Sequence, residues 1–250
     1  MSDKKIKVTN VIKQAVCYLL GLVLIACGIT LTKMSKLGIS PVSSIPRACE
    51  VIWGFTLGTT TLIIYVILIL LQLAVFLIWS LAKKGEFRER WKKYSWLNLL
   101  GFPLTFAFSF IVDLMGVDPN AVGHLLIWIP SPGNYAMKLL YTVCGIIIIG
   151  IGVFLYLRPR WIPMPAEGLA GAISTVTGKA FGDCKTFVDV SMITIALILQ
   201  LIFLGGFKSF ARDDVVVREG TILAAVCVGQ IVKLCTKLFG RPLEKYLGKH

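Results

Sequence analysis

Residues 62–79 read Leu-Ile-Ile-Tyr-Val-Ile-Leu-Ile-Leu-Leu-Gln-Leu-Ala-Val-Phe-Leu-Ile-Trp, with Tyr65 and Gln72 as the only polar side chains. A helix rises 1.5 Å per residue, so about 20 residues cross a hydrocarbon core about 30 Å thick. Residues 143–157 form a second apolar run, in which Tyr156 is the one polar side chain. Runs of this length and purity predict membrane-spanning helices.

The whole chain has the same character, since 56% of its 250 residues are hydrophobic and only 16% are charged. A soluble domain of this length could not hide so much apolar surface. Apolar runs predict six spans, at residues 13–33, 60–82, 95–115, 136–157, 187–206 and 220–239. The first run is too long for a signal-peptide core and lacks a small-residue cleavage site, so we expect it to be an uncleaved span.

The net charge of +13 is explained by loops beside the spans rather than by binding to nucleic acid. With the N-terminus inside, most of the 26 lysines and arginines fall on inside segments, as the positive-inside rule requires. We therefore expect a multi-pass protein of a plasma membrane with both termini in the cytoplasm. The expected partners are the lipid bilayer and a small-molecule solute, and homo-oligomerisation stays open.

Cysteine and histidine usage argues against soluble-type catalysis. Seven cysteines are scattered, mostly in apolar runs, and the chain has two histidines with no CxxC or Cys/His cluster. We therefore expect neither a disulfide framework nor a metal site nor a cofactor. No GxSxG, HExxH or Walker-type loop is present. An enzyme is the weakest alternative, because no nucleophile–base pair can be assembled from spacing.

An internal repeat emerges when the sequence is shifted against itself by 124 residues without gaps. The glycines and prolines that coincide are Gly21/Gly145, Gly28/Gly152, Pro41/Pro165, Gly54/Gly178 and Gly58/Gly182. These residue types shape the backbone, so we expect the halves to share a backbone course. Each half holds three spans, so the second half enters the membrane in the opposite orientation, as in many secondary transporters. The predicted fold class is an all-α integral membrane protein with six transmembrane helices as a 3+3 inverted repeat and two re-entrant half-helices.

The repeat divides the chain into three parts. They are a first repeat at 1–116 with half-helix 40–53, an external connector at 117–135, and a second repeat at 136–250 with half-helix 165–177. In the first half-helix we expect Ser40 as N-cap, Pro41 at the first helical position and Gly54 just past the end. Two alternatives stay open. The stretches could be interfacial loops, or they could cross fully to give eight spans, which would place the basic loop 83–93 outside against the charge rule.

The paired half-helices locate the candidate site. Irregular backbone at membrane depth survives only where it is buried in protein or lines a wet cavity, and half-helix N-termini offer N–H donors. The candidate substrate-binding residues are Ser40, Pro41, Ser43, Ser44, Arg47, Tyr65, Pro165, Glu167 and Gly168. The candidates for coupling or ion pairing are Glu167, Asp183, Lys185 and Asp189.

Purely structural roles compete with these assignments on the half-helices. Glu167, which takes the position of Ser43 in the repeat register, could cap its own helix N-terminus. Ser43 and Ser44 could donate back to helix carbonyls. Arg47 could pair with Glu50 within one turn.

The charged residues at the start of the fifth span are open to the same choice. Lys185 and Asp189 are four residues apart and could form an interfacial ion pair. Asp189 reaches furthest into the membrane and matches Tyr65 in the other half. Ionisable residues inside spans are costly, which favours a functional role.

Three short motifs resemble the YczE/YyaS/YitT family of bacterial membrane proteins. They are Gly38-Ile-Ser-Pro-Val-Ser-Ser-Ile-Pro46, Pro165-Ala-Glu-Gly168 and Gly220-Thr-Ile222. The resemblance implies a bacterial plasma-membrane protein with five or six spans and no settled activity. It implies no substrate and no catalytic residue.

Two functions fit these observations. The first is a secondary transporter of a small polar or anionic solute, with a midplane site between the half-helices and with a proton or cation as coupling partner. The second is a non-transporting sensor, partner or assembly factor whose half-helices are packing devices. A tightly packed centre would favour the second.

Overall fold

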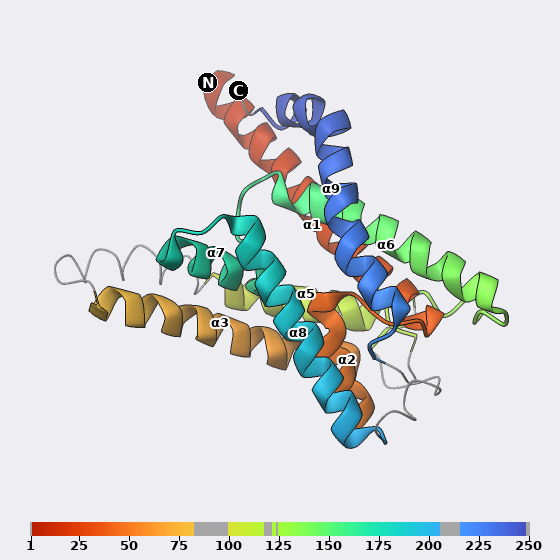
Figure 1. Ribbon diagram of the computed structural model, residues 1–250. Coiled ribbons are helices and arrows are strands. Elements are labelled where there is room, and N and C mark those ends of the chain that lie inside the picture. Colours follow the sequence, from red (N-terminus) through yellow and green to blue (C-terminus); the bar gives the residue numbers. More distant parts are fainter. Residues whose placement is uncertain (1, 83–99, 118–121, 124, 206–215, 249–250) are drawn as a thin grey trace.

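The computed structural model describes residues 2–82, 100–117, 122–123, 125–205 and 216–248, all helix or connecting loop (Figure 1). The helices are α1 (Ser2–Ser35), α2 (Pro41–Trp53), α3 (Leu57–Ala82), α5 (Gly101–Leu114), α6 (Tyr135–Leu157), α7 (Pro165–Thr177), α8 (Phe181–Phe203) and α9 (Glu219–Tyr246). The two ends of the chain lie side by side (Figure 1), where Lys13 and Gln14 donate to the carbonyls of Tyr246 and Leu247.

Five of these helices, α1, α3, α6, α8 and α9, are long and apolar enough to cross a membrane. Their outward faces carry large apolar side chains, such as Ile78 on α3, Ile198 on α8 and Ile222 on α9. Hydrocarbon rather than water is the solvent that suits such faces. The chain is therefore a multi-pass helical membrane protein, as composition predicts.

The helix bounds differ from the predicted spans mainly at the ends. α1 begins before the predicted span 13–33, α8 before 187–206, and α9 continues beyond 220–239. Hydropathy detects only the apolar part of a helix, whereas backbone hydrogen bonding continues through polar turns outside the hydrocarbon. Helix α5 covers Gly101–Leu114 of the predicted span 95–115. Residues 95–99 of that span and the basic loop 83–93 lie outside the described residues.

The two short helices α2 and α7 begin and end in the same way. Each has proline at its first position and 13 residues. Each ends before a glycine of positive φ, Gly54 at 73° and Gly178 at 72°, whose N–H closes the last turn. Proline at the first helical position and a left-handed glycine past the end are the expected signals. At about 20 Å, neither helix is long enough to cross a core about 30 Å thick.

Helices α1 and α6 pack against each other through glycines. Gly28 lies against Gly145 and Gly21 against Gly152, so the two helices run antiparallel. A Cβ added at Gly28 would lie 2.7 Å from the Gly145 carbonyl oxygen, and one at Gly152 would lie 2.8 Å from the Gly21 carbonyl oxygen. Only glycine permits this approach. This crossing forms the centre of the bundle.

The two halves of the chain interlock around this crossing. Helix α7 of the second half packs on α3 of the first, and α2 of the first half packs on α8 of the second. Buried side chains from both halves, such as Tyr65, Ala48 and Ala170, belong to one core. The described residues of the two halves therefore share this core.

Asp113 on α5 caps the start of α3. Its Oδ1 accepts the Gly58 N–H at 2.8 Å, and its Oδ2 accepts the Thr56 hydroxyl at 2.8 Å. Thr56 in turn accepts the Thr59 N–H at 3.1 Å, so the first turn of α3 is satisfied by two side chains. The first N–H groups of a helix have no partner within it, which explains why a carboxylate is buried here.

We therefore expect Asp113→Ala to lower the stability of the protein by about 2 kcal/mol, since it removes two hydrogen bonds to a charged acceptor. Asp113→Asn keeps an acceptor and should lose less. Thermal unfolding of the detergent-solubilised protein measures both. Asp183→Ala is the matched control, because Asp183 lies exposed in the first turn of α8. Equal midpoints for Asp113→Ala and Asp183→Ala would contradict the capping role.

Candidate functional site

A cavity of about 380 Å³ lies where the first turns of α2 and α7 meet the crossing of α1 and α6. Ile25 and Ile29 of α1 and Ile149 and Val153 of α6 form one wall. The candidate residues from the sequence that line it are Ser40, Pro41, Ser43, Tyr65, Glu167, Lys185 and Asp189. The structure thus brings together most of the predicted site.

Three of the charged side chains that line this cavity form one cluster. Lys185 Nζ lies 2.5 Å from Asp189 Oδ1 and 3.5 Å from Glu167 Oε1. The side chains are only 23%, 24% and 13% exposed, respectively. One cation between two carboxylates leaves this cluster, hereafter the Lys185 cluster, with a net charge of −1. The predicted Lys185–Asp189 pair on α8 is confirmed, and Glu167 of α7 also contacts Lys185.

Glu167 does not use all of its hydrogen-bonding capacity. Its Oε2 is buried and has no hydrogen-bond partner among the described residues. The same holds for the hydroxyl of Tyr156, whose side chain lies close to Glu167. Buried polar atoms in proteins nearly always have a partner. Two neighbouring buried atoms without one therefore make this part of the cavity a candidate for binding.

On the opposite side, α2 presents hydroxyl and backbone groups. Ser40 lies at the N-cap position, but its hydroxyl donates to Ser43 Oγ at 3.2 Å rather than capping the helix. Ser40 is thus the N-cap residue, as predicted, but its side chain makes no capping hydrogen bond. Pro46 inside α2 has no N–H to donate to the carbonyl of Val42, a residue that lines the cavity.

Two predicted site residues on α2 do not line the cavity. The Ser44 hydroxyl donates to the Pro41 carbonyl at 2.6 Å, which is the back-bonding alternative. Arg47 pairs with Glu50 at 2.7 Å, as its structural alternative predicted, and Glu50 also pairs with Lys33 of α1. Arg47 is thus held on the side of α2 that faces the end of α1.

Three predicted residues of the second half also lie away from the cavity. Pro165 is buried at the first position of α7, while Met164 and Glu167 on either side of it line the cavity. Gly168 allows α7 to approach α3, since a Cβ there would lie 2.5 Å from Gln72 Oε1. Asp183 is exposed in the first turn of α8.

Sequence reasoning missed two residues of the site. Lys233 of α9 is exposed and lines the cavity. The sequence had indicated only that it belongs to the basic residues on the inner side of the membrane. Tyr156 of α6 lies close to Glu167. It is the one polar side chain in the apolar run 143–157, and this could have marked it as a candidate. Within the part of the chain that the structure describes, no cluster of histidine, cysteine and acidic side chains suits a metal ion.

These features define a multi-pass α-helical membrane protein with a partly polar cavity between its helices. The chain belongs to a family of unknown function, DUF6198, whose model matches residues 12–237. No curated protein and no solved structure gives a significant match. The family match does not link the chain to the YczE/YyaS/YitT family, so that resemblance stays a prediction.

Proposed function

We propose that the protein is a secondary transporter of a small polar or anionic solute, which binds in the cavity between α2 and α7. The observation that carries the proposal is the Lys185 cluster, because it places two carboxylates around one ammonium in a cavity among long apolar helices. Ionisable groups at such depth are costly and are retained chiefly where they bind solutes, ions or protons. These residues line a cavity of about 380 Å³. A tightly packed centre would instead favour a non-transporting protein.

An inverted repeat is part of the proposal. Many cavity-lining residues form pairs offset by the 124 residues of the sequence register, namely Ile25/Ile149, Ile29/Val153, Ser40/Met164, Ser43/Glu167 and Tyr65/Asp189. The bounds of α2 and α7 obey the same offset, and so do the reciprocal glycine contacts of α1 and α6. This correspondence supports a twofold-related pair of halves with the site on the axis, as in transporters built from repeats.

The same proposal makes α2 and α7 re-entrant half-helices and places both termini in the cytoplasm of a bacterial cell. The short lengths of α2 and α7 support re-entry, and the contact of α1 with the end of α9 supports a common side for the termini. The basic residues near this end, including Lys13, Arg158 and Lys245, support the cytoplasmic assignment.

The charge balance suggests how transport would be coupled. The Lys185 cluster has a net charge of −1, and the exposed Lys233 adds one further cation to the cavity lining. At the cluster itself, an anionic solute would be repelled unless a carboxylate carried a proton or a cation. The unpartnered Glu167 Oε2 is the atom best suited to receive a proton, and carboxylate and carbonyl oxygens also suit a hard cation. Solute hydroxyls or oxyanions would then meet Ser40, Ser43 and the Lys185 ammonium.

The test begins with thermal unfolding of the purified protein in the presence of small polar and anionic solutes. Any solute that stabilises it is then followed in uptake into proteoliposomes under an imposed pH or Na⁺ gradient. We expect Glu167→Gln and Ser43→Ala to abolish both stabilisation by the solute and uptake while the protein still folds.

The matched controls are Glu219→Gln and Ser191→Ala, which make the same changes outside the cavity. They should behave like the wild type. Wild-type binding and uptake in both cavity variants would refute the proposal, and solute binding without uptake would point to a sensor.

A further inference from the structure

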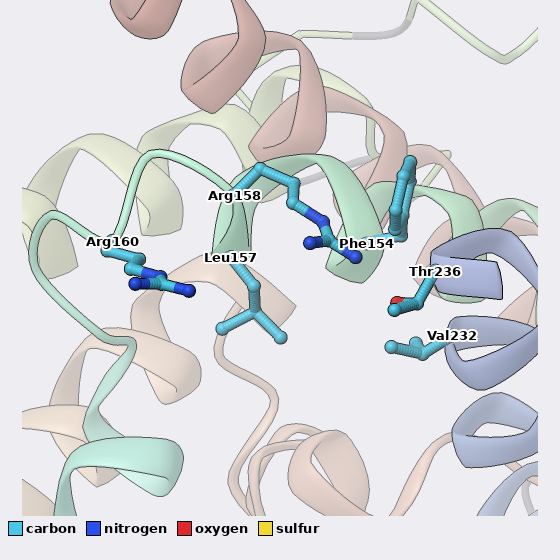
Figure 2. Close-up of a pocket in the computed structure, with 6 residues that line it drawn as sticks. All are labelled: Phe154, Leu157, Arg158, Arg160, Val232 and Thr236. Atoms are coloured by element: carbon cyan, nitrogen blue, oxygen red, sulfur yellow. The ribbon is translucent and has the colours of Figure 1, made fainter. Parts of the chain in front are cut away.

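A second, smaller cavity lies at the end of α6 and shares Leu157 and Val232 with the first. It has a volume of about 180 Å³ and is lined by Phe154, Leu157, Arg158, Arg160, Val232 and Thr236. Figure 2 shows the two arginines at the end of α6 and just beyond it, with Val232 and Thr236 facing this end from α9. A water molecule takes up about 30 Å³ in the liquid, so the cavity has room for a group of several heavy atoms.

The charge of this cavity is positive. Arg158 is neutralised by Glu244 at 2.7 Å, and its guanidinium lies 4.9 Å from the centre of the Phe154 ring. The guanidinium of Arg160 has no ion pair or hydrogen bond with any residue that the structure describes. Guanidinium groups recognise oxyanions such as phosphate through paired N–H donors.

The surroundings place the cavity at the level of a membrane surface. Trp161 follows Arg160, is 40% exposed, lies with its ring 5.6 Å from Tyr18, and donates to Gln14. Aromatic rings with polar tips gather at headgroup level in membrane proteins. The chain termini lie at the same end of the bundle (Figure 1), next to Arg158 through its Glu244 partner.

Apart from Thr236, the remaining lining is apolar. Phe154 and Leu157 of α6 and Val232 of α9 supply the apolar lining. A free inorganic anion gains nothing from contact with this apolar surface, whereas the acyl chain of a phospholipid is stabilised by burial against it. Basic pockets between transmembrane helices at a cytoplasmic surface are the setting in which anionic headgroups bind.

We propose that the Arg158–Arg160 cavity binds the phosphate of an anionic phospholipid, with Arg160 as its main ligand and the acyl chain along Leu157 and Val232. The bound lipid would bridge α6 and α9 and hold the exposed helix α9 against the bundle. Leu157 and Val232 also line the first cavity, so the lipid and solute sites would be neighbours. Arg160, the proposed phosphate ligand, lines the second cavity but not the first, and the Lys185 cluster takes no part in binding the lipid.

The test compares thermal unfolding of the detergent-purified protein with added phosphatidylglycerol, phosphatidylcholine or inorganic phosphate. Phosphatidylglycerol should raise the midpoint of the wild type, and the other two should have little effect at the same concentration. In Arg160→Gln the concentration of phosphatidylglycerol needed for half the effect should rise about tenfold, since charge-assisted hydrogen bonds are lost. Arg160→Lys keeps the charge, so its concentration for half the effect should lie between those of the wild type and Arg160→Gln.

The matched control is Lys36→Gln. Lys36 is the repeat counterpart of Arg160, has the same left-handed backbone, with φ of 58° against 53°, and is absent from the cavity. It should respond to phosphatidylglycerol as the wild type does. An equal response to both lipids, or an unchanged response in Arg160→Gln, would overturn the proposal. A full effect of inorganic phosphate would also overturn it, because the site would then take a soluble anion.

Discussion

Gly28→Ala is expected to lower the stability of the protein by about 1–3 kcal/mol, the usual cost of forcing extra methyl groups into a packed core. The added Cβ would lie 2.7 Å from the Gly145 carbonyl oxygen and 2.6 Å from the Ile149 side chain. A carbonyl of the facing helix cannot turn away as a flexible side chain can, so α1 and α6 must separate. Since Ile25 and Ile149 form a wall of the cavity, the separation would also disturb the site.

The control is the same substitution where the structure leaves space. Gly182 lies in the first turn of α8, and no atom lies within 4 Å of a Cβ added there. Gly182→Ala should be neutral or stabilising by up to about 1 kcal/mol, because alanine favours the helix. Thermal midpoints in detergent compare the two variants directly. Destabilisation of similar size in both would show that the close approach at Gly28 is not the cause.

The bounds of α2 and α7 could be predicted from sequence because their signals are local. Proline at the first helical position and glycine past the end act on the backbone of their own segment, so Pro41 and Gly178 mark the ends whatever the rest of the fold does. The long spans could be predicted for a similar reason, since apolar length alone decides whether a helix suits a bilayer. Charge pairs one turn apart, such as Lys185–Asp189, are also local.

Contacts between distant segments were not predictable in the same way. The sequence register pairs Gly28 with Gly152, but the structure brings Gly28 against Gly145, because α1 and α6 cross in antiparallel order. Arg47 was expected at the site, yet its ion pair with Glu50 holds it elsewhere. The rotation of each helix about its axis decides such contacts, and neither hydropathy nor spacing specifies it uniquely.

Lys185→Met is expected to be among the most destabilising single substitutions near the candidate site. It leaves the carboxylates of Glu167 and Asp189 facing each other, 13% and 24% exposed, without the ammonium that lies 3.5 and 2.5 Å from them. Removing one member of a buried charge pair costs about 3–5 kcal/mol, and partial exposure to the cavity places this case near the lower end. Lys179→Met removes an exposed cation in the loop after α7 and should change stability by no more than about 0.5 kcal/mol.

A double-mutant cycle separates lost packing from lost charge. Asp189→Asn in the Lys185→Met background removes one of the two stranded carboxylates and should recover part of the stability, whereas Asp189→Asn alone should be destabilising. An isolated interfacial pair would give a coupling below about 1 kcal/mol. A coupling clearly above that value, measured from thermal or denaturant unfolding, is what a cluster enclosed by the cavity requires. Additive effects of the two substitutions would mean that Lys185 and Asp189 act independently, and the charge balance on which coupled transport depends would then have no physical basis.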